Sequence, residues 1–239
     1  DPATITYRRQ MLDEMAIAQG QHVIAALWDI RKFYDGINMS ALVQEAMVQG
    51  YPQRLLLIGM KVHMAGRRVT KYQVIGPPIQ PTAGIVPGCG QANVWAKIKL
   101  APVIQKVVQG TGAQIEQYVD DLTGRIEGEG QTILLQFAKQ IQSLWTEAEK
   151  ADIHFAHTKS VLMASTNQLR NRLQDILKRM GIAMGKEMGT RDLGADRVIG
   201  RRVLKTQNKR DKAAKIKAKR IRYLVYRNKK ARKLVKTGL

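Results

Sequence analysis

The spacing of apolar residues along the chain predicts amphipathic helices interleaved with short strands. Apolar positions three or four residues apart, the helical repeat, occupy the ranges 7–20, 38–49, 53–65, 91–108, 131–150 and 167–180. Apolar or alternating runs typical of strands occupy the ranges 22–29, 69–75, 112–119, 122–126 and 160–164. Because the two kinds of segment follow one another irregularly, the pattern favours an α+β fold with a mixed, mainly antiparallel sheet and helices on one of its faces.

Three of the predicted segments carry details that a structure can test. The run 22–29 is apolar up to its last residue, Asp29, which is typical of a strand buried on both faces. The segment 76–90 is rich in Gly and Pro, and compact domains usually keep such a long loop only where it has a function. In the helix 131–150 we expect one apolar stripe, made of Leu134, Leu135, Ala138, Ile141 and Trp145.

The charge of the chain is concentrated at one end. Its 239 residues include 40 Lys+Arg and 19 Asp+Glu, a net charge of +21, and the range 200–239 alone contains 17 basic residues and one acid, Asp211. A helix with a thin apolar stripe on a very basic surface is expected there. Such a field favours a polyanion, because each neutralised phosphate releases condensed counterions, and it predicts nucleic acid as the partner. The alternatives are a solvated tail and a nuclear address signal.

The rest of the composition excludes several classes of protein. A single cysteine, Cys89, allows neither an internal disulfide nor a Cys-rich zinc site, which predicts a reducing compartment. No run approaches the roughly 20 apolar residues of a membrane span, so no membrane association is expected. His154 and His157 are spaced like a pair of metal ligands, but they lack a third ligand nearby, so we expect surface or packing roles.

Three acids stand where strands are predicted to end. Asp29 closes the apolar run 22–29, and Asp120 and Asp121 separate the two strands of a predicted hairpin. Adjacent carboxylates repel, and a divalent cation removes that cost, so hard oxygen ligands without His favour Mg²⁺. Two such ions can stabilise the attacking and the leaving oxygen of a phosphoryl displacement. Ordinary turn chemistry for Asp120 and Asp121, and a cap or turn role for Asp29, are the alternatives.

Two motifs around these acids resemble those of reverse transcriptases. The segment 27–35, Leu-Trp-Asp-Ile-Arg-Lys-Phe-Tyr-Asp, resembles the first palm motif of that family. The segment 118–121, Tyr-Val-Asp-Asp, resembles the most diagnostic one. Between them, the Gly-rich segment 84–92 lies where the family has a loop that opens a helix.

Further matches follow in the family's order. The segment 157–160 is similar to the fourth motif with its lysine, Lys159, and Leu193-Gly194 weakly resembles the fifth. The similarity covers about residues 20 to 200 and is closest to the enzymes of non-LTR retrotransposons and group II introns. The basic segment, with Gln207, Lys209 and Arg210, more weakly resembles the retroelement polymerases of dinoflagellate genomes.

The resemblance implies a chemical role for each matching side chain. Asp29 and Asp120 would ligate two Mg²⁺ ions, or Mn²⁺ in their place, with Asp121 assisting. Lys159 would protonate or neutralise the departing pyrophosphate, the alternative being one more exposed lysine. Tyr34 would lie beneath the sugar of the incoming dNTP and clash with a 2′-hydroxyl, the alternative being a core aromatic residue.

The loop and the basic end complete the implied site. Gly84 and Gly88 would let the backbone approach nucleotide and template, and Tyr118 belongs to the nucleotide-binding signature. The range 200–239 stands where the family has its thumb, which grips the duplex of RNA template and DNA primer through phosphates and 2′-hydroxyls. The basic residues expected to make that contact are Arg201, Arg202, Lys205, Lys209, Arg210 and Arg220.

Two departures from the family pattern set further expectations. Pro87 replaces a Gln that normally contacts nucleotide or template, and Ala92-Asn93 replaces the usual Ser-Pro, which predicts altered nucleotide binding. Only 28 residues precede Asp29, too few for the fingers that hold the triphosphate, so we expect a fragment with weak or no activity in isolation. The expected organisation is an N-terminal helix over 1–20, a palm over 21–199 and a thumb-like basic segment over 200–239.

Motifs and charge together predict an RNA-directed DNA polymerase domain of a retroelement, intracellular and nuclear, that transfers a nucleotide from a dNTP to a primer 3′-hydroxyl. A function of another class stays open: a decayed palm kept as a non-catalytic RNA-binding module for its basic segment. An RNA-directed RNA polymerase is a third interpretation, disfavoured by Tyr34 and by the Tyr-Val-Asp-Asp sequence.

Overall fold

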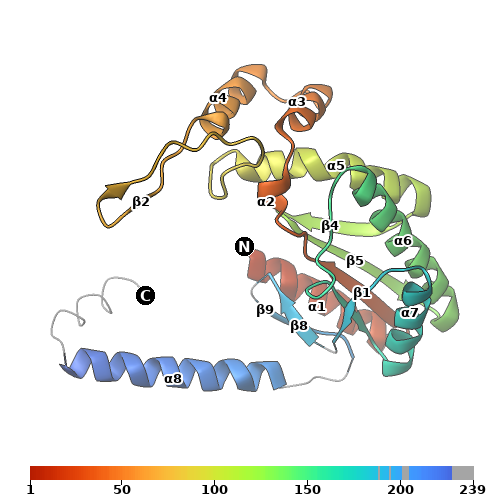
Figure 1. The fold of residues 1–239 in the computed structure, drawn as a ribbon. Coiled ribbons are helices and arrows are strands. Elements are labelled where there is room, and N and C mark those ends of the chain that lie inside the picture. The colour runs from red at the N-terminus through yellow and green to blue at the C-terminus, as the bar shows by residue number, and fades with distance from the viewer. Residues whose placement is uncertain (188, 194, 201–204, 228–239) are drawn as a thin grey trace.

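The computed structural model describes residues 1–187, 189–193, 195–200 and 205–227 (Figure 1). The helices are α1 (Pro2–Ala18), α2 (Phe33–Gly36), α3 (Met39–Val48), α4 (Gln53–Met64), α5 (Ala92–Thr111), α6 (Gly130–Lys150), α7 (Asn167–Arg179) and α8 (Lys205–Arg227). The strands are β1 (His22–Trp28), β2 (Thr70–Lys71), β3 (Val74–Ile75), β4 (Gln114–Tyr118), β5 (Asp121–Gly128), β6 (Val161–Ala164), β7 (Gly185–Lys186), β8 (Gly189–Asp192) and β9 (Ala195–Val198).

Five strands form the main sheet, in the order β4-β5-β1-β6-β7. The β1 strand lies at the centre, antiparallel to β5 on one side and to β6 on the other. The β4 strand is antiparallel to β5, and only β7 runs parallel to its neighbour, β6. The predicted α+β fold with a mixed, mainly antiparallel sheet is therefore confirmed.

One face of the sheet packs on the helices α5, α6 and α7 (Figure 1). From β1, the side chains of Ile24, Ala26 and Trp28 point into this apolar core. The Trp28 ring lies directly over Gly124 of β5, where a Cβ atom would come within 2.6 Å of the ring. A glycine is needed there because any larger residue would displace the tryptophan.

The other face of the sheet packs on α1. Val23 and Ala25 of β1 contact Ala16 of α1 in a second, smaller core that also contains Met163 and Ile199. The expectation that helices cover only one face was wrong. The physical reason lies in the sequence of β1. Successive residues of a strand point to opposite faces of the sheet, and β1 is apolar at nearly every position, so both of its faces have to be covered.

The α1 helix buries a polar face instead of an apolar one. Thr6, Arg9 and Asp13 are at most 3% exposed, whereas Met11 and Met15 are 62% and 53% exposed. The spacing of the two methionines predicted the helix. The polar face of the helix is the buried one, because it contacts charged residues of the strands β8 and β9. These two strands form a separate antiparallel hairpin beside α1.

Several local expectations were wrong. The range 69–75 is not one strand but the small hairpin β2–β3, because Tyr72 and Gln73 have φ angles of 49° and 67° and turn the chain. On α6, the predicted Leu134, Ala138 and Ile141 are buried, but Leu135 is 60% exposed, and Ile133 and Phe137 belong to the buried stripe in its place. The short strands β7, β8 and β9 were not predicted, since their few residues are mostly polar.

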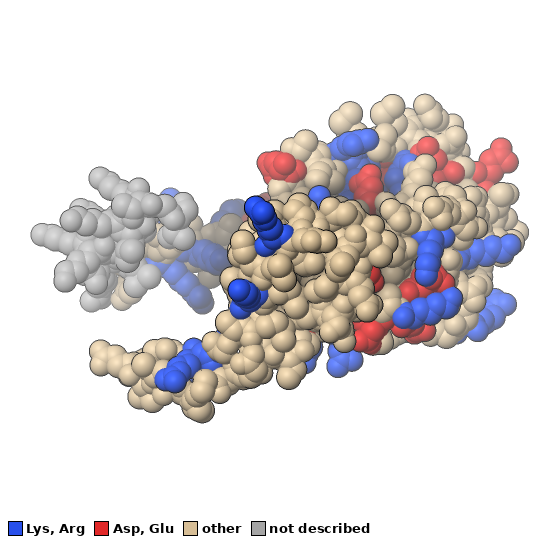
Figure 2. Space-filling model, turned by 90° about the horizontal axis from the view of Figure 1, so that it is seen from above, with Lys and Arg blue, Asp and Glu red and all other residues tan. Residues whose placement is uncertain are grey.

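An outlying part of the surface is apolar and faces solvent. Four residues of α4 are between 46% and 62% exposed, and the β2–β3 hairpin adds further uncovered side chains. Figure 2 shows the surface around α4 as mostly uncharged. The exposed apolar residues of this α4 surface are Leu55, Leu57, Ile58, Val62, Val69, Tyr72, Val74 and Ile75.

The basic segment contains the predicted helix, α8, which extends away from the sheet (Figure 1). Among the described residues, no helix combines the length and apolar character that crossing a bilayer requires.

Candidate active site

The ends of three strands meet at one edge of the sheet. Trp28, the last residue of β1, pairs with Leu122 of β5, and Tyr118 of β4 pairs with Asp121. Continued by one residue, the β1–β5 register puts Asp29 opposite Asp121. Val119, with a φ of 58°, and Asp120 form the two-residue turn between β4 and β5. The predicted hairpin is confirmed, with the turn one residue earlier than the Asp120-Asp121 pair.

A cleft of about 430 Å³ opens beside these strand ends. Its walls are the sheet, the start of α1 and the β8–β9 hairpin, and four residues predicted for the site line it: Asp29, Tyr118, Asp121 and Lys159. The residues that complete the lining are Pro2, Leu27, Trp28, Leu122, Thr123, Val161, Thr190, Arg191, Asp192 and Leu193. The structure therefore brings together residues from the first palm motif, from the Tyr-Val-Asp-Asp motif and from the fourth motif.

Asp29 is fixed by its backbone and approached by a lysine. Its N–H donates to Ser160 Oγ at 3.3 Å, and its carbonyl accepts from the Ala156 N–H at 2.8 Å. The Nζ atom of Lys159 lies 3.6 Å from Asp29 Oδ1, with 69% of the lysine side chain and 38% of the aspartate side chain exposed. An exposed ammonium in that place can move between the aspartate and an anionic ligand in the cleft.

Asp121 lies in the most negative part of the cleft. The pKa of the Asp121 carboxyl is raised to about 6, first because burial removes part of its surrounding water. The negative charges of Asp120, Asp29 and Asp192 contribute to the same rise, and Arg9 opposes it. The carboxylates thus feel one another strongly, which is the condition that a bound cation would relieve.

Asp120 and Tyr34 lie at the margin of this group. Asp120 is half-buried in the β4–β5 turn and does not line the cleft. Burial raises the pKa of the Tyr34 phenol, and the charges of Asp120 and Asp121 raise it as well, so its ring lies within electrostatic reach of both. Tyr34 also contacts Phe33 edge to face, with ring centroids 5.4 Å apart.

The Gly-rich loop packs directly on α2. Gly84 has a φ of 86°, and a Cβ atom there would lie 3.0 Å from the carbonyl oxygens of Tyr34 and Asp35. The N–H of Ile85 donates to the Tyr34 carbonyl at 2.8 Å. Glycine is therefore required at 84 by the contact between loop and helix. Gly88 has a φ of 84° with open space around it, and a contact of either glycine with a nucleotide stays a prediction.

Four of the six residues predicted to contact nucleic acid belong to α8. Arg201 and Arg202 fall outside the described residues, and the backbone of Lys205, Lys209 and Arg210 belongs to the helix. Arg220 is exposed on the same helix. The part of α8 whose side chains are described is exposed along most of its length, with six basic residues, namely Lys212, Lys215, Lys217, Lys219, Arg220 and Arg222.

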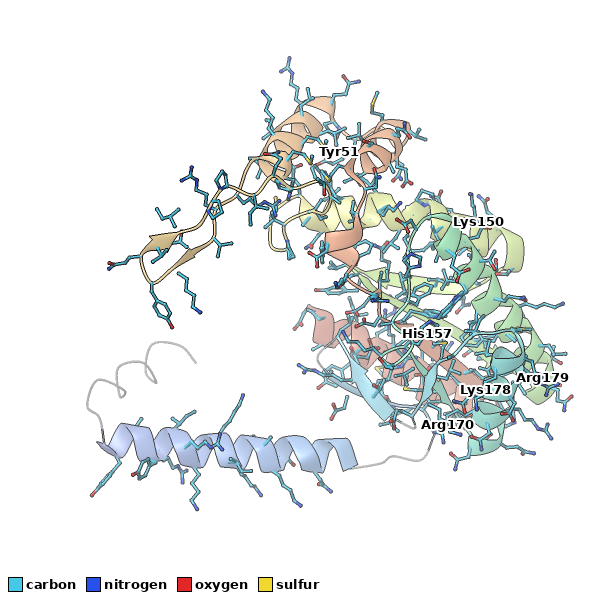
Figure 3. The ribbon with its side chains drawn as sticks, viewed as in Figure 1. Tyr51, Lys150, His157, Arg170, Lys178 and Arg179 are labelled. Atoms are coloured by element: carbon cyan, nitrogen blue, oxygen red, sulfur yellow. The ribbon has the colours of Figure 1, made fainter. Side chains whose placement is uncertain are left out.

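A second group of basic residues was not predicted. Figure 3 shows Arg170, Lys178 and Arg179 on α7, at the side of the molecule away from α8. His157, also labelled there, donates a hydrogen bond from Nδ1 to the Ala183 carbonyl at 3.1 Å, and its ring centroid lies 5.1 Å from that of Trp145. The packing role expected for this histidine is confirmed.

Comparison with solved structures gives a structure of apo telomerase from Candida tropicalis, truncated from its C-terminal domain. The TM-score is 0.56 at 13% sequence identity, and the similarity covers 83% of this chain and 39% of that one. The chain has a reverse-transcriptase-like fold. It spans about two fifths of the telomerase chain that it matches. No protein-family model matches the sequence, and no curated protein does.

Within the reverse-transcriptase-like fold, the β8–β9 side of the cleft is what sequence reasoning missed. Thr190, Arg191 and Asp192 line the cleft, but the strands that carry them are short, polar and without a period. The weak match at Leu193-Gly194 was the only signal. Leu193 does line the cleft, whereas Gly194 lies outside the described residues.

Proposed function

We propose that this chain is an RNA-directed DNA polymerase domain of a retroelement, which transfers a nucleotide from a dNTP to a primer 3′-hydroxyl with pyrophosphate leaving. The observation that carries the proposal is the cleft in which Asp29 and Asp121, far apart in the sequence, lie together with Lys159 on a reverse-transcriptase-like sheet. Carboxylates at the ends of adjacent strands are held rigidly, as the chemistry of phosphoryl transfer requires.

The donor chemistry of the site fits Mg²⁺ or Mn²⁺. The carboxylates of Asp29, Asp120 and Asp121 are hard oxygen ligands, and the raised pKa of Asp121 reflects burial together with the negative charge of its neighbours, both of which a cation would offset. Among the described residues no three or more His, Cys, Asp and Glu side chains form a ready-made cage. Mg²⁺ does not need one, since it usually binds one or two carboxylates and completes its shell with water and substrate phosphate.

In this proposal the aspartates hold the cations and other side chains orient the substrates. Bound cations supply Lewis-acid stabilisation of the charge on the reacting phosphate. Lys159, whose ammonium already lies beside Asp29, neutralises or protonates the pyrophosphate as it departs. Tyr34 is within reach of the same carboxylates and contacts the sugar, so that a 2′-hydroxyl is excluded.

The basic residues of α8 bind the template–primer duplex. An exposed helix with several Lys and Arg suits an A-form duplex, which proteins recognise through phosphates and shape. The second candidate function, a non-catalytic RNA-binding module, rests on this same helix. It shares the expected duplex binding and lacks any role for the aspartates.

Paired substitutions in the cleft test the proposal. Asp29→Asn and Asp121→Asn should each lower primer extension on an RNA template at least about a hundredfold, because they remove charge at the reacting phosphate. They should also abolish the rise in melting temperature that Mg²⁺ produces in the unaltered protein. Duplex binding, measured by fluorescence anisotropy, should be unchanged.

The control is Asp152→Asn, an exposed aspartate outside this cleft that contacts His154. It should leave extension and the Mg²⁺ effect unaltered. If the unaltered protein neither extends a primer nor gains stability with Mg²⁺, the polymerase proposal is refuted. Retained RNA binding would then favour the binding module.

A further inference from the structure

A network of buried charges joins α1 to the β8–β9 hairpin. At its inner end, the Arg9 Nη1 atom donates to both carboxylate oxygens of Asp192, at 2.9 and 3.0 Å. The Thr6 hydroxyl donates to the backbone carbonyl of Asp192 at 2.8 Å. Arg9 also reaches β4, because its Nε donates to Glu116 at 2.7 Å. Arg9 and Asp192 are only 3% and 2% exposed.

The outer end of the network is equally buried. Asp13 is fully buried, and its Oδ2 accepts from the Nε and Nη2 atoms of Arg197 at 2.9 and 2.8 Å. Its Oδ1 accepts from the Nε atom of Arg125 at 2.8 Å. Nearby, the N–H of Val198 donates to the side chain of Gln10 at 2.9 Å. Four strands, β4, β5, β8 and β9, are therefore each joined to α1 by directed polar contacts.

Only the inner end of the network reaches the cleft. Asp192 lines it, as do its neighbours Arg191 and Leu193, whereas Asp13, Arg197 and Gln10 do not. Two buried ion pairs are an expensive way to attach a hairpin, since apolar side chains of similar volume would hold it at least as well. What an arginine adds is direction, because its rigid guanidinium plane holds Asp192 of β8 through Nη1 and Glu116 of β4 through Nε at the same time.

We propose that the Arg9–Asp192 pair is a positioning device that sets the β8–β9 hairpin at a fixed distance from the β4–β5 turn and so fixes the width of the cleft. The inference rests on the proposed polymerase function for its consequence: the cleft width decides where the primer end lies relative to Asp29 and Asp121. Neither Arg9 nor Asp192 touches the substrates through its charged group, because both are buried and bonded within the network.

The position of the β8–β9 hairpin relative to the β4–β5 turn can be followed between two spin labels. One is attached at Arg191→Cys on the hairpin. The other is attached at Asp35→Cys on α2, next to Tyr34, whose phenol feels the charges of Asp120 and Asp121 at the turn. Both positions are exposed, and the chain also carries Cys89→Ala. Electron–electron resonance then gives the distribution of distances between the labels. Arg9→Lys keeps the charge and loses the planar guanidinium that bonds Asp192 and Glu116 through separate nitrogens, and Asp192→Asn keeps the shape and loses the charge.

We expect both variants to broaden or shift the distance distribution. The control Gln10→Ala removes a contact between α1 and β9 that lies away from the cleft, and it should leave the distribution unchanged. In primer extension, both variants should lower kcat per folded molecule about tenfold or more, as misplacement of a reacting group does, with duplex affinity changed less than twofold. Gln10→Ala should leave kcat unaltered.

Two results would overturn the inference. One is an unchanged distance distribution in both Arg9→Lys and Asp192→Asn. The other is an equal change in Gln10→Ala, which would mean that any loosening of α1 has the same effect. If Asp192→Asn does not fold, the more conservative Arg9→Lys decides. The distance measurement needs no catalysis, so absence of extension by the unaltered protein would refute the proposed function and leave this test intact.

Discussion

The two faces of the central sheet are stabilised in different ways. On the helix side, α5, α6 and α7 cover the sheet with a continuous apolar core that includes Trp95, Phe137 and Leu144, each at most 1% exposed. On the α1 side the apolar core is small, and buried charges of α1, β5, β8 and β9 make up the contact. Apolar packing is strong but without direction, whereas the charged contacts fix orientation. The cleft opens on the side where orientation is fixed.

The largest loss of stability on either face of the sheet should come from Asp13→Ala. The substitution leaves Arg197 and Arg125 without their buried partner, so the free energy of unfolding should fall by about 3–5 kcal/mol. Urea denaturation followed by circular dichroism measures it. Glu14→Ala, at the next and exposed position, is the control and should cost less than about 0.5 kcal/mol. Similar small losses in both would show that the charged side contributes little to stability.

A slightly smaller loss is expected on the helix side. Leu144→Ala opens a cavity in the core and should lower the free energy of unfolding by about 2–5 kcal/mol. Because the side chain is uncharged, the loss should be the same at pH 5 and at pH 8. The matched control is Leu135→Ala on the same helix, whose side chain is 60% exposed and should contribute little. Equal losses for the two leucines would contradict the placement of the core.

The smallest predicted effect on stability is a gain instead of a loss. The folded-state pKa of Asp121 is raised to about 6 from 3.8, so the charged carboxylate disfavours the folded state at neutral pH. Asp121→Asn should therefore stabilise the protein at pH 7.5 by up to about 1 kcal/mol, a figure reduced for solvent screening. The gain should shrink as the pH falls through 6 toward 4, where the unaltered carboxyl is protonated in the folded state.

Thermal melts of the two proteins across that pH range measure the difference. Asp152→Asn, which changes an exposed aspartate, should show no such dependence on pH. A gain for Asp121→Asn that stays constant from pH 7.5 to 4 would mean that the repulsion among carboxylates is not its source.

The same contrast explains which elements could be predicted from the sequence and which could not. The continuous apolar run of β1 and the helical repeat of α6 are local patterns, so the ranges of both elements were predicted to within one or two residues. Asp29 and Asp121 were found because each stands at the boundary of such a run. The β8–β9 hairpin has no period, and its position depends on contacts with Thr6, Arg9 and Asp13, far away in the chain. Pairing between distant charges leaves no local pattern.

Glycines show a similar limit. The resemblance singled out Gly84 for an approach of the backbone to nucleotide and template, which stays a prediction, and the structure shows that its φ is positive. The sequence did not reveal the reason, because the close contact is with the carbonyls of Tyr34 and Asp35, which only the folded chain brings near. Gly124 was not singled out at all, although the ring of Trp28 depends on it.

The exposed apolar side chains of α4 and the β2–β3 hairpin can attract other copies of the chain, whereas its positive charge attracts nucleic acid. With a net charge of +21, copies of the chain repel one another in dilute buffer, and added salt screens that repulsion. Raising the ionic strength should therefore release nucleic acid and, over the same range, favour clustering of the protein with itself. Purification in high salt would remove bound nucleic acid but promote self-association of the protein.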